Sequence, residues 1–248
     1  MDNNLITSFS KYFQVVLADN EELRNEVYRI RYDVYCRELQ YECPDEHPNG
    51  LEMDVYDNHS YHCLLLHRPS QTFAGCVRLV YNNLAEPESR LPFEATCGES
   101  LFKNYQDTIL SDRRQFGEIS RLAIPETFRR RKTDAGSPLG NLSVHSDVLQ
   151  QGQRRFPYIP LGLYLAAAAA GLELGLNCVF AMMEPRLVRH LHRFGIVFQQ
   201  AGDIIEHRGE RAAFYIDRKG LSSNLKYPVR GLLDLILSDI GTSLKTGT

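Results

Sequence analysis

The segment that most restricts the fold is Leu161–Met183, which is almost entirely apolar. Its length suits a membrane span, and Gly171 and Gly175 have the GxxxG spacing that pairs helices within membranes. Glu173 and Asn177 interrupt the segment, however, and a charge in the middle of a span is costly. We therefore predict a buried helix followed by a core strand, and no membrane span.

Strand-like and helix-like patterns alternate along the rest of the chain. Asp19 is predicted to cap the first helix, with Glu22 at the capping-box position. An early hairpin and a later strand–helix–strand unit predict one sheet covered by helices, in a single α/β domain over residues 1–248. The predicted strands are 11–17, 61–67, 72–81, 116–124, 178–183, 196–200 and 212–216. The predicted helices are 19–41, 161–174, 186–194 and 229–240, with short helical pieces at 93–105.

Composition excludes several classes of protein. The net charge of −3 argues against broad affinity for nucleic acid, which needs a basic surface. The first residues lack a basic stretch followed by an apolar core, so we expect a cytoplasmic protein whose six cysteines are free thiols. No Cys/His spacing suits zinc, and His190 and His192 point to different faces of a helix, so no metal site is predicted.

Charged residues within predicted strands are the main chemical signal. Strict alternation would place Glu118 and Ser120 on one face of strand 116–124, and Arg121 on the other. Buried charges without partners are very costly. We therefore predict an ion network that joins Asp54, Asp57, Arg78, Glu118 and Arg121. A purely structural network remains the alternative to a catalytic one.

Four motifs occur in the order found in a known family. They are Arg31, Tyr35 and Tyr41; Glu52, Asp54 and Asp57 as E-x-D-x-x-D; Arg78 and Leu79; and Glu118, Ser120 and Arg121 as E-x-S-R. The set, over roughly residues 12–125, resembles the acyl-homoserine-lactone synthases (LuxI-type autoinducer synthases). It also resembles the N-acyl amino acid synthases and the acyltransferases that accompany exosortase systems.

Departures from the family pattern favour one branch. The tryptophan that follows the family's helix is replaced by tyrosine, and the chain contains no tryptophan. A long basic excursion at about 125–157 and the helix at 229–240 make the chain longer than a typical lactone synthase. These differences favour the N-acyl amino acid or exosortase-associated branch.

The resemblance implies a GNAT-like acyl-CoA N-acyltransferase fold with a mixed, mostly antiparallel sheet flanked by helices. It implies transfer of a fatty acyl group from acyl carrier protein (acyl-ACP) or acyl-CoA, as co-substrate, to the amine of an amino acid or similar small acceptor, with no tightly bound cofactor. Glu118 is the predicted base, and backbone N–H groups at 122–124 are predicted to bind the oxyanion. The predicted catalytic residues are Glu118, Ser120 and Arg121. The predicted substrate-binding residues are Arg31, Tyr35, Tyr41, Asp54, Asp57, Arg78, Leu122 and Ile124.

Two further predictions concern recognition of the substrates. Arg31 and Arg121 are candidates to hold the carboxylate of an amino acid acceptor, because a guanidinium binds a carboxylate in a bidentate manner; a solvated helix residue is the alternative for Arg31. A basic run lies in the excursion, where the glycine-spaced cradle Q/R-x-x-G-x-G/A is absent. Docking of an acidic acyl carrier protein therefore fits better than tight coenzyme A binding, and a solvated loop is the alternative. The predicted docking residues are Arg129, Arg130, Arg131, Lys132, Arg154 and Arg155.

Other functions stay open on the sequence alone, because one fold hosts many functions. They are an autoinducer synthase that uses S-adenosylmethionine, a coenzyme-A-dependent acetyltransferase, and a non-catalytic acyl-binding module. Cys76 and Cys97 lack a paired base and are poor candidates for an acyl-accepting nucleophile. Acyl length would depend on Leu163, Ala167 and Val179 if these residues line the pocket.

Overall fold

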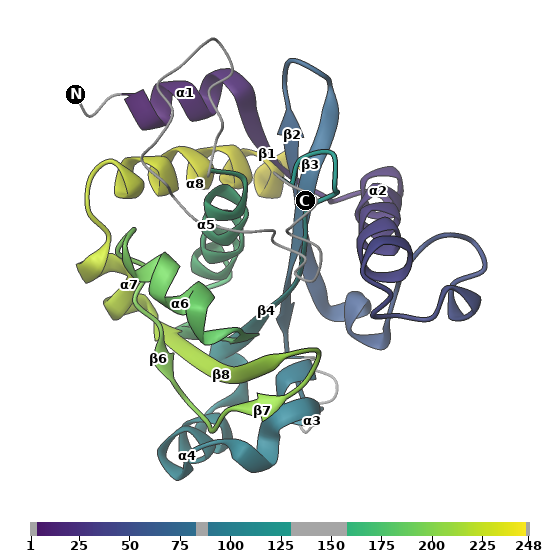
Figure 1. Ribbon diagram of the computed structural model, residues 1–248. Coiled ribbons are helices and arrows are strands. Elements are labelled where there is room, and N and C mark those ends of the chain that lie inside the picture. The colour runs from purple at the N-terminus through teal and green to yellow at the C-terminus, as the bar shows by residue number, and fades with distance from the viewer. Residues whose placement is uncertain (1–3, 83–88, 130–157, 247–248) are drawn as a thin grey trace.

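A mixed sheet organises the molecule (Figure 1). The computed structural model describes residues 4–82, 89–129 and 158–246. These residues form an eight-stranded sheet of order β1-β2-β3-β4-β5-β8-β6, with β7 also pairing β8. Only β4 and β5 pair in parallel, so the predicted mostly antiparallel sheet is confirmed. The strands are β1 Phe13–Leu17, β2 Ser60–His67, β3 Thr72–Tyr81, β4 Phe116–Ala123, β5 Cys178–Met183, β6 Gln199–Gln200, β7 Ile205–Glu206 and β8 Glu210–Asp217.

Helices cover both faces of the sheet. Figure 1 shows α1, α5 and α8 on one side and α2 on the other. The segment predicted to be a buried helix and a core strand forms α5 and β5, and α5 is apolar all round because it packs into the main core. Among the described residues, no helix has the length and apolar character to cross a membrane. The helices are α1 Asn4–Tyr12, α2 Glu21–Arg31, α3 Pro92–Cys97, α4 Lys103–Ser111, α5 Tyr158–Glu173, α6 Pro185–His192, α7 Arg218–Asn224 and α8 Val229–Thr246.

Several predicted boundaries are wrong. Asn20 caps α2 in place of Asp19, since its side chain accepts a hydrogen bond from the Leu23 N–H at 3.0 Å. The helix predicted to run to residue 41 is α-helical only to Arg31, and it continues as a π-helix over Tyr32–Glu38. The strand predicted from residue 11 begins at residue 13, after α1, and the strand predicted at 196–200 is reduced to β6.

The sheet splits between β4 and β5. The two strands pair over three positions, the last of which joins Glu118 to Phe180. Beyond that point β4 continues to pair with β3, and β5 continues to pair with β8. Glu118 therefore lies where the two strands separate.

A bulge in β4 overturns the predicted alternation of its side chains. Cys76 pairs with Ala123 and Arg78 with Ser120, so two residues of β4 lie opposite one residue of β3. Arg121 has a φ of +48°, and its side chain reaches the same face as that of Ser120. Leu122 packs instead into the core on the α5 side. The bulge therefore brings Glu118, Ser120 and Arg121 to one face.

Candidate active site

Arg31 at the end of α2 is fully buried and has carboxylate partners within the chain. Its Nε donates to Glu52, and its Nη1 donates to Asp57 at 2.6 Å. Burial alone would lower its pKa, but these two carboxylates raise it well above its ordinary value. In the structure the guanidinium of Arg31 is fully buried against these two internal carboxylates, and its role in holding an acceptor's carboxylate stays a prediction.

The E-x-D-x-x-D motif has a local structural basis. Asp54 caps the short 3₁₀-helix Val55–His59, and Asp57 accepts the Asp54 N–H in return at 2.8 Å. Arg78 Nη1 donates to Asp54 at 2.6 Å and to Asp57 at 2.8 Å. Burial opposes ionisation of Asp57, but Arg31 and Arg78 hold its pKa well below the usual range. The predicted network is therefore confirmed for both aspartates and for Arg78, whose Nε also donates to Ser120 at 3.1 Å.

Arg121 links this network to the partly exposed edge of the site. Its Nε lies 3.3 Å from Glu52, and its Nη2 lies 3.1 Å from Glu42 and 3.4 Å from Asp54. Its guanidinium stacks over the Tyr35 ring at 5.5 Å. Arg121 thus belongs to the network, as predicted, and it joins the buried pairs to a pair nearer the surface.

Tyr35 and Tyr41, the two aromatic residues predicted to bind substrate, pack at this partly exposed edge of the site. Tyr35 lies in the π-helix, and its hydroxyl donates to the Leu122 carbonyl at 2.9 Å. Burial is the main cause that raises the pKa of Tyr35. The Tyr41 ring stacks on Tyr35 at 6.5 Å, and its backbone N–H donates to the Tyr35 carbonyl. The side chains of Leu122 and Ile124 are buried in the core, and their role in substrate binding stays a prediction.

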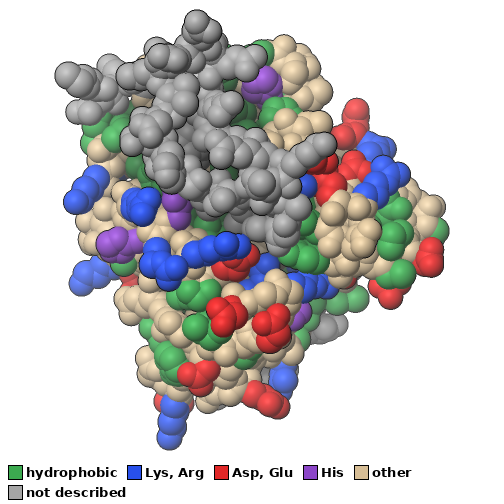
Figure 2. Space-filling model, viewed as in Figure 1, with side chains coloured by type: hydrophobic (Ala, Val, Ile, Leu, Met, Phe, Trp, Pro, Cys, Tyr) green, Lys and Arg blue, Asp and Glu red, His purple; other side chains and the backbone are tan. Residues whose placement is uncertain are grey.

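Arg208 completes the edge and was not predicted. It lies in the turn between β7 and β8, and its Nη1 is 3.1 Å from the same Glu42 oxygen that Arg121 contacts. Its guanidinium also lies over the Tyr41 ring at 5.3 Å. Figure 2 shows basic and acidic side chains side by side across the middle of one face of the molecule. No sequence pattern links Arg208 to Glu42, which stands 166 positions earlier.

Glu118 lies apart from the ion pairs, so its predicted membership of the network is wrong. Its Oε2 accepts the Phe93 N–H from the first turn of α3 at 2.7 Å. Burial raises its pKa to about 8, because the Phe93 N–H, Arg78 and Arg121 offset only part of the desolvation. The adjacent Phe93 and Phe180 rings stack at 4.7 Å, and the side chain of Glu118 is buried. The site therefore contains a carboxyl group that is largely protonated at neutral pH.

His62 is a second buried titratable group that sequence reasoning missed. It pairs across the β2–β3 hairpin with Arg78, and its Nε2 lies 3.6 Å from Asp57. Burial, with Arg31 beside it, lowers its pKa to about 4, so the imidazole is neutral. Its ring nitrogens have no hydrogen-bond partner among the described residues.

All six cysteines are free, as predicted. Cys97 lies near Glu118 and donates to the Phe93 carbonyl at 3.0 Å. Burial raises the pKa of Cys97 and of Cys76 to about 12, so both thiols stay protonated at neutral pH. Neither has the properties of a nucleophile. Within the described part of the chain, no group of three or more His, Cys, Asp or Glu side chains has the arrangement of a metal site.

The predicted carrier-docking residues lie largely outside the described residues. These are Arg130, Arg131, Lys132, Arg154 and Arg155. Arg129 is described, and it forms an ion pair with Glu38 of the π-helix with only 7% of its side chain exposed. In the structure Arg129 joins the chain after β4 to the π-helix on the α2 side, and its docking role stays a prediction.

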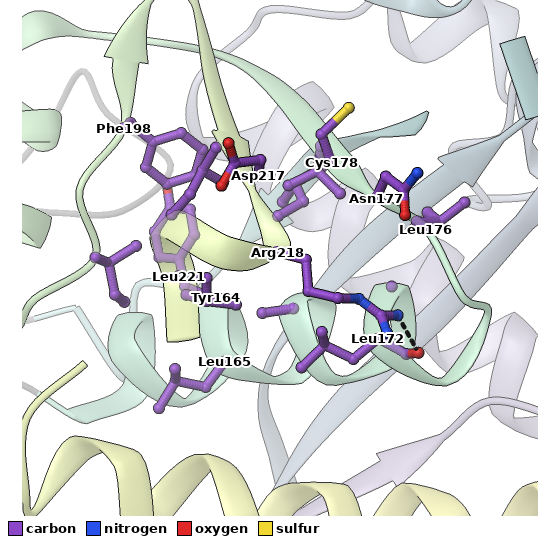
Figure 3. A pocket seen from close by; sticks show the side chains of 16 residues that line it. Tyr164, Leu165, Leu172, Leu176, Asn177, Cys178, Phe198, Asp217, Arg218 and Leu221 are labelled. Atoms are coloured by element: carbon purple, nitrogen blue, oxygen red, sulfur yellow. Dashed lines mark hydrogen bonds between the residues drawn. The ribbon is translucent and has the colours of Figure 1, made fainter. Parts of the chain in front are cut away.

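An apolar pocket lies on the opposite, α5 face of the sheet (Figure 3). It has about 490 Å³ of empty space, including its open mouth, between α5, β5, β8 and α7. Tyr164 and Phe198 line it, and Arg218 stands at its rim, where it donates to the Leu172 carbonyl at 2.8 Å. Val179 lines the pocket, whereas Leu163 and Ala167 pack into the core. Ile119, the neighbour of Glu118 in β4, also lines it.

The sheet of this chain opens beside a buried acid and has helices on both faces, which agrees with the predicted GNAT-like fold. The model of the acetyltransferase (GNAT) domain family matches residues 30–137. No curated protein sequence matches the chain. The fold class predicted from the motifs is therefore confirmed.

Particular solved structures share this fold over most of the chain. TofI, in a ternary complex with an inhibitor and MTA, has a TM-score of 0.58 at 18% identity, covering 91% of this chain and 99% of TofI. FeeM, an N-acyl amino acid synthase from uncultured soil microbes, has a TM-score of 0.55 at 11% identity, covering 86% and 94%. BjaI, a CoA-dependent acyl-homoserine lactone synthase with SAM and isopentyl-CoA, has a TM-score of 0.51 at 19% identity, covering 91% and 89%. The resemblance stated from the motifs is thus confirmed at the level of the fold.

Proposed function

We propose that the protein is an N-acyltransferase that moves a fatty acyl group from a carrier-bound thioester to the amine of an amino acid or similar small acceptor. One observation carries this proposal. Glu118 is buried where β4 and β5 separate, with a pKa of about 8. A carboxylate with so high a pKa is a strong enough base to accept a proton from an attacking amine.

The geometry supports a direct transfer. In this scheme the thioester carbonyl lies in the opening between β4 and β5, and the neutral amine attacks its carbon. Glu118 accepts the amine's proton, the carbon–sulfur bond breaks, and the thiol leaves with a proton returned to it. Beyond Glu118 the edge of β4 that faces β5 pairs with no strand among the described residues, so its N–H groups can stabilise the oxyanion. Protonated Cys76 and Cys97 fit a mechanism without an acyl-enzyme.

The two faces of the sheet suit the two substrates. Ile119 follows Glu118 in β4 and faces the apolar pocket, so a fatty chain that enters through the opening would reach that pocket. The charged residues lie on the other face, with Glu118. We therefore assign the α5 face to the acyl chain and the α2 face to the acceptor.

The donor and the setting are further parts of the proposal. Acyl carrier protein is the proposed partner, and exosortase systems are the proposed context. Docking is assigned to Arg129, Arg130, Arg131, Lys132, Arg154 and Arg155. Acyl-CoA is the alternative donor, since BjaI is a CoA-dependent synthase. A cytoplasmic location suits six free cysteines.

Lactone synthesis from S-adenosylmethionine is the second candidate function. It is favoured by the overall likeness to TofI with MTA and to BjaI with SAM. Sensitivity of turnover to S-adenosylmethionine separates it from N-acyl amino acid synthesis.

Mass spectrometry of organic extracts tests the proposal. Cells that express the protein are compared with cells that express Glu118→Gln and with an empty-vector control. A new acylated amine with the parent alone would support N-acyl transfer and would name donor and acceptor. Extracts that match the control, together with thermal stabilisation by acyl thioesters, would indicate a module that binds acyl groups without transferring them.

A further inference from the structure

The carboxylate of Glu42 occupies a site between two arginines. One oxygen, Oε1, lies 3.1 Å from Arg121 Nη2 and 3.1 Å from Arg208 Nη1. The two guanidinium groups come from distant segments, the bulge of β4 and the turn between β7 and β8. Paired guanidinium groups are well suited to bind a carboxylate. We propose that Arg121 and Arg208 bind the carboxylate of the acceptor, and that Glu42 leaves this place when the acceptor enters.

Stacked rings fix the two arginines at this spacing. Arg121 lies over Tyr35 and Arg208 lies over Tyr41, and the two tyrosines stack on each other. Tyr35 is anchored in turn by its hydrogen bond to Leu122. The pair is therefore held in place by contacts that do not involve Glu42, and it persists when Glu42 moves.

The charge balance shows why one carboxylate must leave. Among the described side chains of the network, the arginines are Arg31, Arg78, Arg121 and Arg208, and the carboxylates are Glu42, Glu52, Asp54 and Asp57. The nearby Glu118 and His62 are both largely uncharged at neutral pH. An additional anion would leave a partly buried excess of negative charge, which is unfavourable. The acceptor's carboxylate is accommodated when one internal carboxylate moves to water.

Glu42 is the carboxylate that is free to move. Glu52 and Asp57 are buried, and Asp54 caps a helix and pairs with Arg78. Glu42 lies in the irregular segment after the π-helix, with 18% of its side chain exposed, and its partners Arg121 and Arg208 are 23% and 29% exposed. A short side-chain rotation therefore exposes both guanidinium groups to an incoming ligand.

The inference names the class of acceptor, and it rests on the proposed function. Arg121 is three residues from Glu118 along β4, about 10 Å of strand, and it is near enough to affect the pKa of Glu118. A carboxylate bound by Arg121 would place an adjacent amino group toward that base. The acceptor is therefore an α-amino acid, as a free amino acid or as the amino acid portion of S-adenosylmethionine.

The test compares each amino acid with its own carboxamide, using the purified full-length chain, dodecanoyl-CoA and dodecanoyl-ACP. Thiol release and product mass are followed for both acceptor series. We expect the acids to be preferred, and Arg208→Gln to raise KM for the acid at least about tenfold, with little change in kcat or in the rate with the amide. Glu42→Gln should lower KM for the acid. Arg37→Gln is the matched control, because Arg37 is an exposed arginine that pairs with Asp33.

The outcomes separate the two proposals. Turnover with no preference for the acid, or an equal loss with both acceptors in Arg208→Gln, would overturn the carboxylate site and leave the transferase intact. Absence of thiol release with every amine would count against the transferase. Calorimetric titration of the same acids and amides then tests the carboxylate site by binding alone, without turnover. The carboxylate site is supported if binding requires both the carboxylate of the ligand and Arg208. It is refuted if the acid and the amide bind equally, or if the parent and Arg208→Gln bind equally.

Discussion

The two faces of the sheet are buried by different means. On the α5 side, alanine and larger apolar side chains pack against one another, and the helix is apolar all round. On the α2 side, Arg31, Glu52, Asp57 and Arg78 are buried as ion pairs beneath a small apolar cluster. Replacing a buried ion pair by apolar residues is often neutral or stabilising, so such pairs are weak evidence of selection for stability. The comparison indicates that the α5 side is stabilised by burial of apolar surface, whereas the α2 side holds charged groups in fixed positions at a cost in desolvation.

The largest expected effect concerns Glu118. If Glu118 is the base, Glu118→Gln should lower kcat/KM by about 10²–10⁴-fold while the fold is retained. Because the ionised form of Glu118 acts as the base, the parent-to-variant rate ratio should rise with pH and level off above about pH 8. A ratio that is constant between pH 6 and pH 9 would exclude this role. Dividing by the rate of the variant removes the contribution of the acceptor's own titration.

Glu118 also gives a test based on stability, because rising pH should lower the free energy of unfolding while it raises the activity. Between its ordinary pKa of 4.5 and about 8, the folded chain holds a proton on Glu118 that the unfolded chain has lost. This contribution to the free energy of unfolding therefore decreases as pH rises through that interval. Urea unfolding of the parent and of Glu118→Gln should show the decline in the parent alone. Parallel pH profiles would contradict the raised pKa.

Removing one partner of the buried ion pairs on the α2 side should lower the free energy of unfolding by as much as a large cavity in the apolar core does. Arg31→Met leaves Glu52 and Asp57 buried with fewer partners, and we expect a loss of about 3–5 kcal/mol in the free energy of unfolding. Ile236→Ala in the opposite core is the matched variant, with an expected loss of about 2–5 kcal/mol. The loss in Arg31→Met should shrink at low pH, where the carboxylates are protonated, and the loss in Ile236→Ala should not. Equal pH dependence of both variants would contradict the ionic origin.

The apolar face should be sensitive to a single added methyl group. A Cβ at Gly162 of α5 would lie 2.7 Å from a ring carbon of Phe9, so we expect Gly162→Ala to lose about 1–3 kcal/mol. Gly171→Ala in the same helix is the control, because its nearest neighbours, Leu79 and Val179, lie at an ordinary 3.7 Å. Thermal unfolding of both variants measures the difference. Equal Tm values would show that Phe9 moves aside at no cost.

The smallest expected effect concerns the hydrogen bond that joins the π-helix to β4. Tyr35→Phe removes the hydrogen bond to the Leu122 carbonyl, for an expected loss of about 1 kcal/mol. The variant retains the ring beneath Arg121, so activity should change little. Chemical denaturation and steady-state kinetics together check this. A large loss of activity with unchanged stability would instead assign the hydroxyl to the reaction.

The sequence was sufficient to predict the features that depend on local hydrophobic pattern and on the energetic cost of burying an unpaired charge. The apolar run predicted α5 and β5, and the cost of unpaired charge predicted the contacts among Asp54, Asp57 and Arg78. The bulge at Arg121 has no periodic signal, so the face that strict alternation assigned to Arg121 was wrong.

The rest of the site depends on contacts that only the tertiary fold creates. Glu42 and Arg208 meet across 166 positions, and no motif links them. The burial of Arg31 could not be predicted either, because an arginine near the end of an amphipathic helix is usually solvated. The single-domain prediction and the docking role of the basic excursion stay predictions.

The split in the sheet has a mechanical consequence. β1 to β4 form one half-sheet, and β5 to β8 form another, and three residue pairs join the halves. α5 packs on β2 and β3 of the first half, whereas the far wall of the apolar pocket belongs to β5, β8 and α7. A small rotation of one half about this seam would widen the opening beside Glu118 and enlarge the pocket together, without breaking the ladders within either half. Entry of the thioester and accommodation of a longer chain would then be a single movement.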